Sequence, residues 1–314
     1  MSDRCLQCGL PIDGAACGEY HRKCAVKLFG SASVPKFAYS MDELNRLARN
    51  LIHSRISVPG VQPKLSVHLE RGGEGADRLT LVGLEGDYIL KLPTSRYSEL
   101  PESEHFAMTL ARECGIGTAE FGLVRLANGE LAYLTRRMDR EDGVKHMEDA
   151  CQLMERPSER KYNGSYEQIA RQIFKKSVDP IADILKFFEV VVYSYVIGNS
   201  DMHLKNFSLI REHNGEWHLA AAYDLVPVKT VLPADMDDLA LMLNGKNRRL
   251  SAEDFRKAAA SMQLSEVQFE RTLKRVIKPL SEKLDSVLAR SFISDDFKKR
   301  VAEVIKGRVS VLGK

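Results

Sequence analysis

The pattern of apolar residues changes near residue 140, and this change limits the fold of the chain more than any other feature of its sequence. Before it, short runs such as "KLSVHLE", "RLTLVGL" and "DYILKLP" have the composition and alternation of strands, with Gly-rich turns between them. After it, residues 180–198 form one long apolar helix and residues 251–314 are patterned almost entirely as helices. We therefore predict an α+β fold of two lobes, a β-rich lobe over 31–139 and an all-helical lobe over 140–314.

Turn and cap signals predict where individual elements begin and end. A helix is expected over "ESEHFAMTLAREC" (102–114), whose apolar residues recur at every fourth position before a glycine. Asn128-Gly129 and Asn214-Gly215 each separate two strand-like runs, and Asn-Gly is a strong signal for a two-residue hairpin turn. Ser251-x-x-Asp254 resembles a capping box at the start of the last helical region.

The composition is that of a globular protein and excludes several classes of function. The chain has 314 residues, of which 44% are hydrophobic and 28% charged, and its formal net charge is only +3. So small a charge, without a concentrated basic patch, gives no reason to expect direct nucleic-acid binding. No apolar run approaches the ~20 residues that span a bilayer, and "MSDRCLQC" lacks the apolar segment of a secretory signal. We therefore expect no membrane association and a cytoplasmic location, where cysteines serve more often as metal ligands than in disulfides.

The N-terminal segment, residues 1–30, is rich in cysteine and is expected to stand apart from the two lobes. It contains two pairs of soft metal ligands, each pair separated by two residues: Cys5, Cys8, His21 and Cys24. Such a set suits a tetrahedral Zn²⁺ ion, and Cys17 is an alternative to His21 as the third ligand. Four protein ligands leave no open position, so we expect a structural zinc. The competing interpretation is a short tail with free thiols.

A dense polar cluster lies between the long apolar helix and the next strand-like run, in "VIGNSDMHLKNFSLI" (196–210). Asp201 and Asn206 are five residues apart, as in the catalytic loop of phosphoryl-transfer enzymes, where the Asp meets the substrate hydroxyl and the Asn binds Mg²⁺. Lys205 offers a cation for the transferred phosphoryl group. The following hairpin is expected to return Asp224 to the same place, as a second, charged Mg²⁺ ligand. The alternative is that the Asp and the Asn only cap a helix or turn.

Two features of the first lobe also fit phosphoryl transfer. Lys91 ends a strand-like run, and Glu104 follows thirteen residues later in the first turn of a predicted helix. In kinases a strand lysine paired with a helix glutamate holds the α- and β-phosphates. Taken singly, each is more often a solvated surface charge. The segment "RISVPGVQPKLSV" (55–67) has one glycine and by itself matches neither glycine-rich phosphate motif. The order of these parts along the chain is what indicates a kinase.

Together these segments resemble the HipA-type serine/threonine kinases of bacterial toxin–antitoxin modules. The resemblance is carried by "RISVPGVQPKLSV", "YILKLP", "ESEHFAMTLAREC", "GNSDMHLKNFSLI" and "AAYDLVP", and it runs from about residue 50 to the C-terminus. The short chain is similar to the HipT type, in which the N-terminal subdomain of HipA is a separate protein. The resemblance implies a two-lobed protein-kinase-like fold with ATP and Mg²⁺ as cofactors.

The resemblance also implies roles for individual residues. The expected catalytic set is Asp201 as the base, with Lys91, Glu104 and Lys205, and the expected Mg²⁺ ligands are Asn206 and Asp224. The nucleotide is expected to contact Pro59, Gly60, Val61, Gln62, Pro63, Lys64, Lys91, Arg136, Arg137, Met138, His203, Asn206, Tyr223 and Asp224. Ser57 is the expected autophosphorylation site. Some HipT-type kinases have a Ser-x-Ser motif here, and this chain keeps only its first serine. Arg136, in the expected adenine-binding hinge, replaces an acidic residue of HipA.

The activity implied by the resemblance is transfer of the ATP γ-phosphate to a protein serine or threonine. An aminoacyl-tRNA synthetase is the expected target, and growth arrest is the expected consequence. The expected partners are a DNA-binding antitoxin and a separate small protein that supplies the missing N-terminal subdomain. Two alternatives stay open: a small-molecule kinase on the same fold, and a catalytically inactive, zinc-dependent binding module. The second is disfavoured because the complete set of kinase residues is retained.

Overall fold

The computed structural model describes residues 4–12, 16–37, 39–41, 43–44, 46, 62, 64–72, 77–82 and 86–313. The chain forms two compact units. The first unit consists of Met1–Phe106, Ala119–Arg140 and Arg290–Ile293. The second unit consists of Ala107–Thr118, Glu141–Ala289 and Ser294–Lys314. Helices α3 (Leu100–Glu113) and α9 (Glu266–Arg290) contribute residues to both units.

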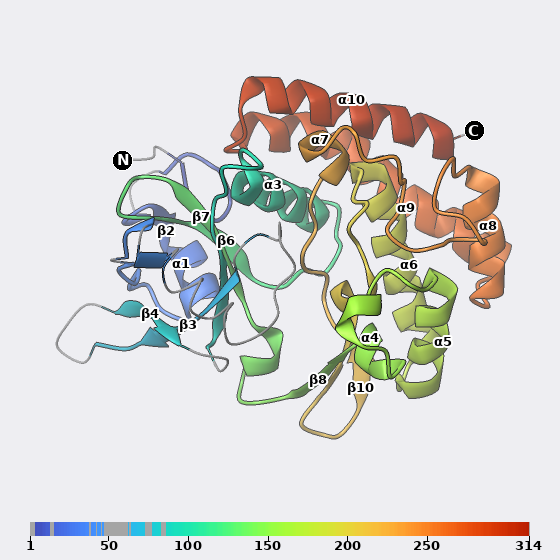
Figure 1. Ribbon diagram of the computed structural model, residues 1–314, viewed down its shortest axis with the longest axis horizontal. Helices are drawn as coiled ribbons and strands as arrows, with labels where there is room; N and C mark the ends of the chain where they lie inside the picture. The colour runs from blue at the N-terminus through green and yellow to red at the C-terminus, as the bar shows by residue number, and fades with distance from the viewer. Residues whose placement is uncertain are drawn as a thin grey trace. The chain divides into compact units, whose positions relative to one another are not determined.

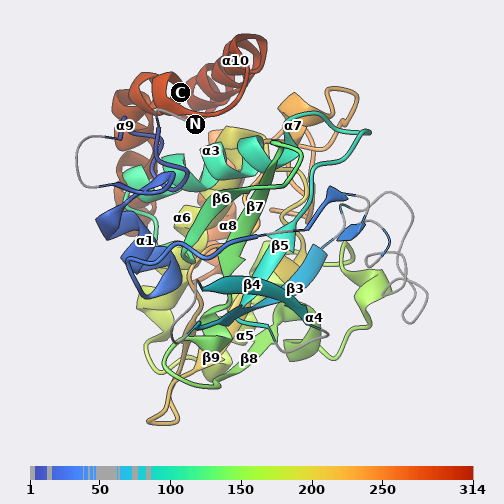
Figure 2. The same cartoon turned by 90° about the vertical axis from the view of Figure 1, so that its left-hand side faces the viewer.

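A five-stranded antiparallel sheet forms the centre of the first unit (Figure 2). Its order is β4-β3-β5-β7-β6, with β3 Lys64–Glu70, β4 Arg78–Val82, β5 Tyr88–Lys91, β6 Phe121–Arg125 and β7 Leu131–Arg136. The three strands predicted before residue 93 are present. The hairpin at Asn128-Gly129, where β6 pairs with β7, is also present, but its loop has three residues, 127–129, and not the predicted two. Gly129 makes this turn with a φ of 87°, which residues with a Cβ rarely adopt. Strand β5, which ends at Lys91, lies between β3 and β7.

The N-terminal segment packs on this sheet within the first unit. Its elements are β1 (Ala16–Cys17), β2 (Tyr20–His21) and α1 (Arg22–Phe29). Gly30 ends α1 with a φ of 71°. The ring centre of Phe29 lies 5.4 Å from that of Tyr20 and 6.4 Å from that of Tyr88 on β5, and all three side chains are buried. The cysteine-rich segment therefore shares the apolar core of the β-rich unit.

Helices make up most of the second unit (Figure 1). Helix α6 (Pro180–Ile197) is the most apolar of them; Asp179 caps its first turn, and Gly198 ends it with a φ of 75°. The other helices are α4 (Ala150–Leu153), α5 (Tyr166–Lys176), α7 (Val228–Val231), α8 (Ala252–Ser261), α9 and α10 (Asp295–Leu312). The predicted capping box at Ser251 and Asp254 is present at the start of α8. None of the described helices combines the length and the apolar character needed to cross a bilayer.

The second unit is mainly helical but not all-helical, because it also contains a three-stranded antiparallel sheet. The order is β10-β9-β8, with β8 His146–Asp149, β9 Ser208–Arg211 and β10 Trp217–Leu219. The hairpin of β9 and β10 forms at the Asn214-Gly215 signal, with a three-residue loop over 213–215 in place of the predicted two. The sequence did not predict β8. This strand is four residues long and only partly buried, and its partner β9 is distant along the chain. A short strand of this kind has no periodicity of its own and is defined by its pairing.

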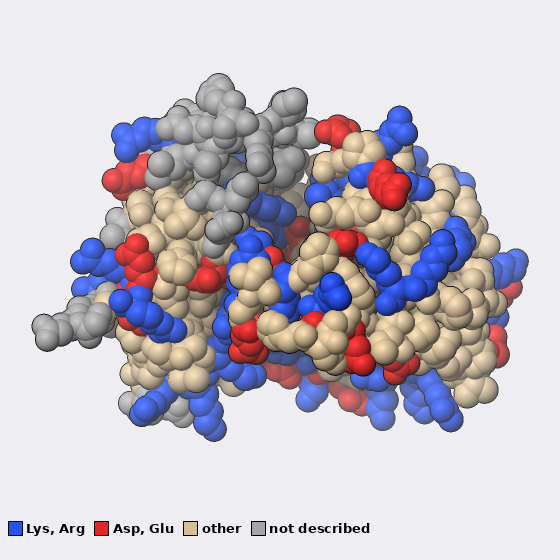
Figure 3. All heavy atoms as spheres, turned by 90° about the horizontal axis from the view of Figure 1, so that it is seen from below, with Lys and Arg blue, Asp and Glu red and all other residues tan. Residues whose placement is uncertain are grey.

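Charged side chains of both signs are interspersed over the described part of the face drawn in Figure 3. Some charged side chains of the described residues form exposed ion pairs, such as those of Arg256 with Glu253 and Glu266. Exposed pairs contribute little to stability because both charges are well hydrated and lose side-chain entropy on pairing. The stability of each unit therefore depends on its buried residues.

Candidate functional site

The first unit contains the predicted lysine–glutamate pair. The Lys91 Nζ at the end of β5 donates to the Glu104 Oε1 of α3 over 2.5 Å. Only 4% of the Lys91 side chain and 1% of the Glu104 side chain are exposed. The Lys91 Nζ also lies 5.4 Å from the ring centre of Tyr133, on the neighbouring strand β7. The pairing is needed, because an isolated charge buried this deeply would cost several kcal/mol.

Only part of the predicted nucleotide loop belongs to the described residues. The Gln62 Nε2 donates to the Leu92 carbonyl over 2.7 Å, and Lys64 begins β3 directly opposite Lys91. Both residues therefore lie beside the strand end that carries the lysine. The following predicted residues lie outside the described part of the chain: Ser57, Pro59, Gly60, Val61 and Pro63.

The predicted hinge lies at the end of β7. Arg136 is the last residue of the strand, and Met138 begins a 3₁₀ turn, Met138–Arg140. The Arg137 guanidinium donates two hydrogen bonds to the Asp139 carboxylate, over 3.0 and 2.7 Å. This bidentate pair holds the Arg137 side chain against its own turn. Contact of the hinge with adenine stays a prediction.

The predicted catalytic loop of the second unit begins where α6 ends. The Asn199 Oδ1 accepts from the Asp201 amide over 3.2 Å, and the Asp201 carbonyl accepts from the His203 amide over 2.8 Å and from the Asn206 Nδ2 over 3.1 Å. Asn206 is buried, in a 3₁₀ turn over Leu204–Asn206, whereas Asp201 is exposed. Because the Asn206 amide group donates to a carbonyl, its Oδ1 is the atom suited to a metal ion. The loop thus holds a carboxylate and an amide oxygen five residues apart.

Asp224 is held near this loop by the residue before it. The Tyr223 hydroxyl donates to the Lys205 carbonyl over 2.9 Å and bonds the Ser208 hydroxyl over 2.6 Å. The predicted return of the chain is therefore present, and the Tyr223 hydroxyl supports the loop itself. Asp224 has a φ of 59°, a left-handed conformation that is strained for a residue with a Cβ.

Sequence reasoning missed Tyr162. Its hydroxyl donates to the Asp201 Oδ1 over 2.5 Å, and its ring lies edge-on to the His203 ring, 5.1 Å between centres. Burial and the negative charges of Asp201 and Asp224 raise the pKa of the Tyr162 hydroxyl, which therefore stays protonated as a donor. An isolated tyrosine in a polar loop, 39 residues from its partner, carries no sequence signal. Tyr162 therefore holds one oxygen of the predicted catalytic carboxylate.

Two predicted site residues of the loop, Lys205 and His203, make contacts that stabilise the structure. The Lys205 Nζ pairs with the Asp149 Oδ2 over 2.8 Å, and Asp149 is also the N-cap of α4. Sequence analysis did not find Asp149. His203 is buried, and its amide closes the turn on Asp201. The contact of Lys205 with a phosphoryl group and that of His203 with a nucleotide stay predictions.

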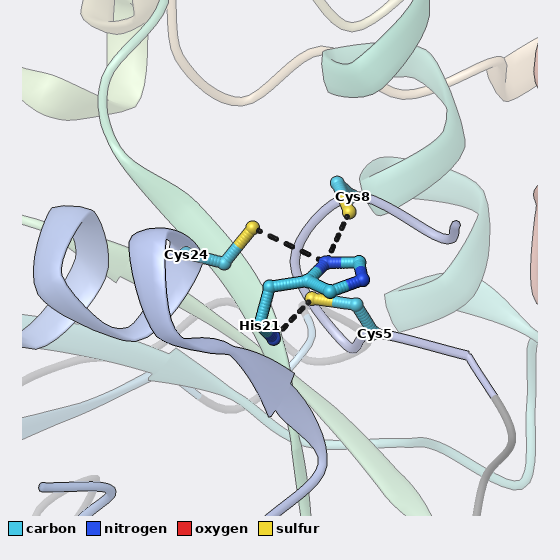
Figure 4. A group of neighbouring side chains, drawn as sticks. All are labelled: Cys5, Cys8, His21 and Cys24. Carbon is cyan, nitrogen blue, oxygen red and sulfur yellow. Dashed lines mark hydrogen bonds between the residues drawn. The ribbon is translucent and has the colours of Figure 1, made fainter. Parts of the chain in front are cut away.

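The four predicted zinc ligands lie together in the first unit (Figure 4). Their ligand atoms, on Cys5, Cys8, His21 and Cys24, all lie within 4.8 Å of one another, and Cys17 is not in the group. The His21 Nδ1 lies 3.3 Å from the Cys8 Sγ and 3.9 Å from the Cys24 Sγ. A carbonyl only accepts, so the His21 Nε2, 2.8 Å from the Pro11 carbonyl, carries the proton. The Nδ1 is then the basic nitrogen, as in histidines that bind metal with a carbonyl as outer partner.

The turn between Cys5 and Cys8 explains the spacing of the first pair. The Gly9 amide donates to the Cys5 carbonyl and the Cys5 amide to the Leu10 carbonyl, both over 2.8 Å. Gly9 takes a φ of 73° here, and a Cβ on it would lie 2.4 Å from the Arg290 carbonyl oxygen. Hydrogen bonds from the neighbouring thiols lower the pKa of the Cys5 thiol. Three sulfur atoms and one imidazole nitrogen at this spacing fit a four-coordinate Zn²⁺ ion.

Comparison with known proteins shows the family to which the chain belongs. Residues 56–284 match the HipA-like C-terminal domain. The chain belongs to this family. A relative in Sinorhizobium fredii, named "Putative kinase Y4dM", is 34% identical over 228 residues, which cover 68% of this chain and 55% of the relative. A Haemophilus influenzae relative, named "Putative kinase", is 27% identical over 288 residues and 82% of each chain.

The fold of HipA agrees with that of this HipA-like chain. The solved Shewanella oneidensis HipA, in complex with HipB and operator DNA, matches with a TM-score of 0.68 at 20% identity, over 82% of this chain and 64% of that chain. The curated Shewanella oneidensis protein named "Serine/threonine-protein kinase toxin HipA" is 27% identical over 196 residues, 55% of this chain and 43% of the relative. The chain thus spans about half the length of several curated relatives. The predicted family and kinase-like fold are confirmed.

Proposed function

We propose that this HipA-like chain is an ATP-dependent serine/threonine protein kinase. The observation that carries the proposal is the buried Lys91–Glu104 pair, together with the loop that presents Asp201 and Asn206. A sheet core gains little from a buried ion pair, since apolar residues of similar size stabilise it equally well. A lysine held for phosphate binding explains the pair. The kinase names of the relatives support the same conclusion.

In this proposal the side chains of the chain divide the chemistry among them. The exposed Asp201 carboxylate would accept the proton of the substrate hydroxyl as the hydroxyl oxygen bonds to the γ-phosphorus, while the bond from that phosphorus to the β–γ bridging oxygen breaks and ADP leaves. Tyr162 holds one carboxylate oxygen and leaves the other to the substrate. Lys91, oriented by Glu104, donates to the nucleotide phosphates. Asn206 and Asp224 would hold Mg²⁺, which neutralises phosphate charge when it is bound.

Transfer from γ-labelled ATP tests the proposal. Purified protein is incubated with labelled ATP and a bacterial lysate, and the labelled products are identified. We expect phosphoserine or phosphothreonine in a protein, and no label with Asp201→Asn. Label on a sugar or an antibiotic, with unlabelled proteins, would favour the small-molecule kinase. An absence of both transfer and ATP hydrolysis would favour the binding module.

We also propose the biological setting that the resemblance implies. The chain would be the toxin of a HipBST- or HipBA-type toxin–antitoxin module, neutralised by a DNA-binding antitoxin and partnered by a separate small protein that carries an N-terminal subdomain. The solved complex of Shewanella oneidensis HipA with HipB and operator DNA supports an antitoxin partner. An aminoacyl-tRNA synthetase is the proposed target, and its phosphopeptide should dominate the labelled lysate.

Ser57 is proposed to switch the kinase off when the enzyme phosphorylates it. A phosphoserine carries about −1.5 to −2 charges and would repel the phosphates of ATP. Mass spectrometry should find phosphate on Ser57 in wild-type protein and none in Asp201→Asn. Ser57→Asp should bind ATP poorly and Ser57→Ala should bind it normally. Tight ATP binding by Ser57→Asp would contradict the switch.

The cysteine and histidine cluster is proposed to hold one structural zinc ion per chain. The mutual closeness of the four ligand atoms and the Pro11 carbonyl behind His21 support this assignment. Elemental analysis of protein purified without chelator should find one equivalent of zinc, and its absence would refute the proposal.

A further inference from the structure

The cysteine knuckle, defined as residues 4–12 and 16–29, is in direct contact with helix α3. Gln7 lies between the ligands Cys5 and Cys8, and its carbonyl accepts from the His105 Nε2 over 2.8 Å. The Gln7 side chain donates to the Glu120 carboxylate over 3.2 Å. Gln7 is 3% exposed and His105 2% exposed. The turn that joins two metal ligands is thus itself a buried partner of α3.

The knuckle also contacts the β6 edge of the five-stranded sheet. The Leu123 amide of β6 donates to the Leu6 carbonyl over 2.8 Å, and the Tyr20 hydroxyl donates to the Leu123 carbonyl. Arg125, at the end of β6, pairs with Glu19 over 2.8 Å. A Cβ on Gly122 would lie 2.8 Å from a methyl group of Leu28 in α1. These contacts bind both halves of the knuckle to one strand.

His105 and Glu104 are neighbours on the same turn of α3. Consecutive helical residues point about 100° apart, so the Glu104 carboxylate meets Lys91 while the His105 ring meets the knuckle. The His105 ring is packed edge-on between Phe121 and Phe292, each 5.5 Å away between ring centres. A turn anchored on both sides cannot rotate without breaking one of the two contacts.

We infer that the metal-bound knuckle is a positioning element for Glu104, acting through Gln7 and His105. This inference rests on the proposed kinase function, because it gives a purpose to the orientation of Glu104. The metal holds Cys5 and Cys8 and therefore the turn that carries the Gln7 carbonyl. Without the metal the thiols no longer converge, the turn loses its shape, and α3 loses its anchor beside Glu104. Gln7 and His105 are positioning residues, since neither would touch the nucleotide.

Three variants of the full chain test this inference. Cys8→Ser removes a metal ligand, His105→Leu removes the contact while leaving the ligands intact, and Cys17→Ser is the matched control, a cysteine of the same segment outside the ligand group. Zinc content, hydrogen exchange of residues 100–106 and phosphotransfer are measured for each. Exchange in α6 of the second unit is the internal reference.

We expect Cys8→Ser to lose zinc and to raise exchange of residues 100–106 by about tenfold or more, with exchange in α6 unchanged. His105→Leu should keep zinc, raise the same exchange, and lower phosphotransfer by about 10- to 100-fold, since a misplacement near 1 Å has effects of this size. Cys17→Ser should behave as wild type in all three measurements.

The outcomes separate this inference from the proposed function. If wild-type protein holds no zinc, or if His105→Leu leaves exchange of residues 100–106 unchanged, the coupling is wrong, whatever the activity. If wild-type protein transfers no phosphate while exchange responds as expected, the kinase proposal fails and the coupling of the knuckle to α3 stands as a structural fact.

Discussion

The two groups of proposed catalytic residues are stabilised in opposite ways. In the first unit, Lys91 and Glu104 are buried and each depends on the other for its charge. In the second unit, the Asp201 side chain is exposed, and its loop is held by hydrogen bonds within residues 199–206 and by the hydroxyl groups of Tyr162 and Tyr223. Loss of a buried, paired charge therefore affects both the free energy of unfolding and the proposed activity. Loss of an exposed carboxylate on a loop affects the activity alone. Substitutions should change stability in the first unit and rate alone in the second.

The largest effect on rate is expected from Asp201→Asn. The substrate hydroxyl loses its proton acceptor, so phosphotransfer should fall by roughly 10²–10⁴-fold. The thermal unfolding midpoint and nucleotide binding should stay near the wild-type values, because the side chain is exposed. Rates from labelled ATP and a calorimetric scan measure the two quantities. Retention of more than about a tenth of the rate would show that Asp201 is not the base.

Lys91→Met should lower both the stability of the protein and its phosphotransfer activity. It leaves the Glu104 carboxylate buried without its cation, at a cost of about 3–5 kcal/mol in the free energy of unfolding. The double variant Lys91→Met/Glu104→Leu should recover most of the stability and none of the activity. Denaturant unfolding of the single and double variants, beside phosphotransfer, checks this. Equal stability of Lys91→Met and wild type would mean that the pair is not buried in solution.

Asp224→Ala should weaken Mg²⁺-dependent nucleotide binding more than Asp201→Asn does. A hard dication depends on a carboxylate ligand, whereas the base acts after binding. ATP binding is measured in both variants over a range of Mg²⁺ concentrations. The same Mg²⁺ dependence in the two variants would show that Asp224 is not a metal ligand.

The strained φ of 59° also predicts that Asp224→Gly folds without loss of stability.

The smallest effect is a pH dependence in the first unit. Burial, with further contributions from Glu99 and Glu130, raises the pKa of Glu102 from its ordinary 4.5 to about 7. The folded chain then binds the proton more tightly than the unfolded chain, so stability falls as the pH rises from 4.5 to about 7. Glu102→Gln, which cannot ionise, should unfold about 2–4 °C higher than wild type at pH 8. At pH 4 the two proteins should unfold at the same temperature, and a gain at both pH values would contradict the assignment.

Features set by neighbouring residues were predicted correctly. The hairpins at Asn128-Gly129 and Asn214-Gly215, the capping box at Ser251 and the helix after residue 100 depend on turn and cap chemistry within a few positions. The five-residue separation of Asp201 and Asn206 is likewise local, because one short loop holds both residues. Local hydrogen bonds restrict the backbone in the same way in many contexts, and a sequence alone can reveal them.

Features that need distant segments were missed or left open. Strand β8, which the prediction of an all-helical lobe excluded, is defined by β9. Tyr162 meets Asp201 from 39 residues away. The choice between Cys17 and His21 was open in the sequence, since both follow the first cysteine pair at acceptable spacing. Only the packing of the knuckle brings the His21 ring, and not Cys17, to the other three ligands.

The sequence by itself determined the family, the hairpins and the long helices, and the residue types of the proposed chemistry. Only the tertiary structure decided which of those residues are buried, which are held by partners, and which others support them. Lys91 and Glu104 are two ordinary charges until β5 and α3 exclude water around them. Spacing specifies what a short segment can do alone, whereas burial and contact arise from chain parts that meet only after folding.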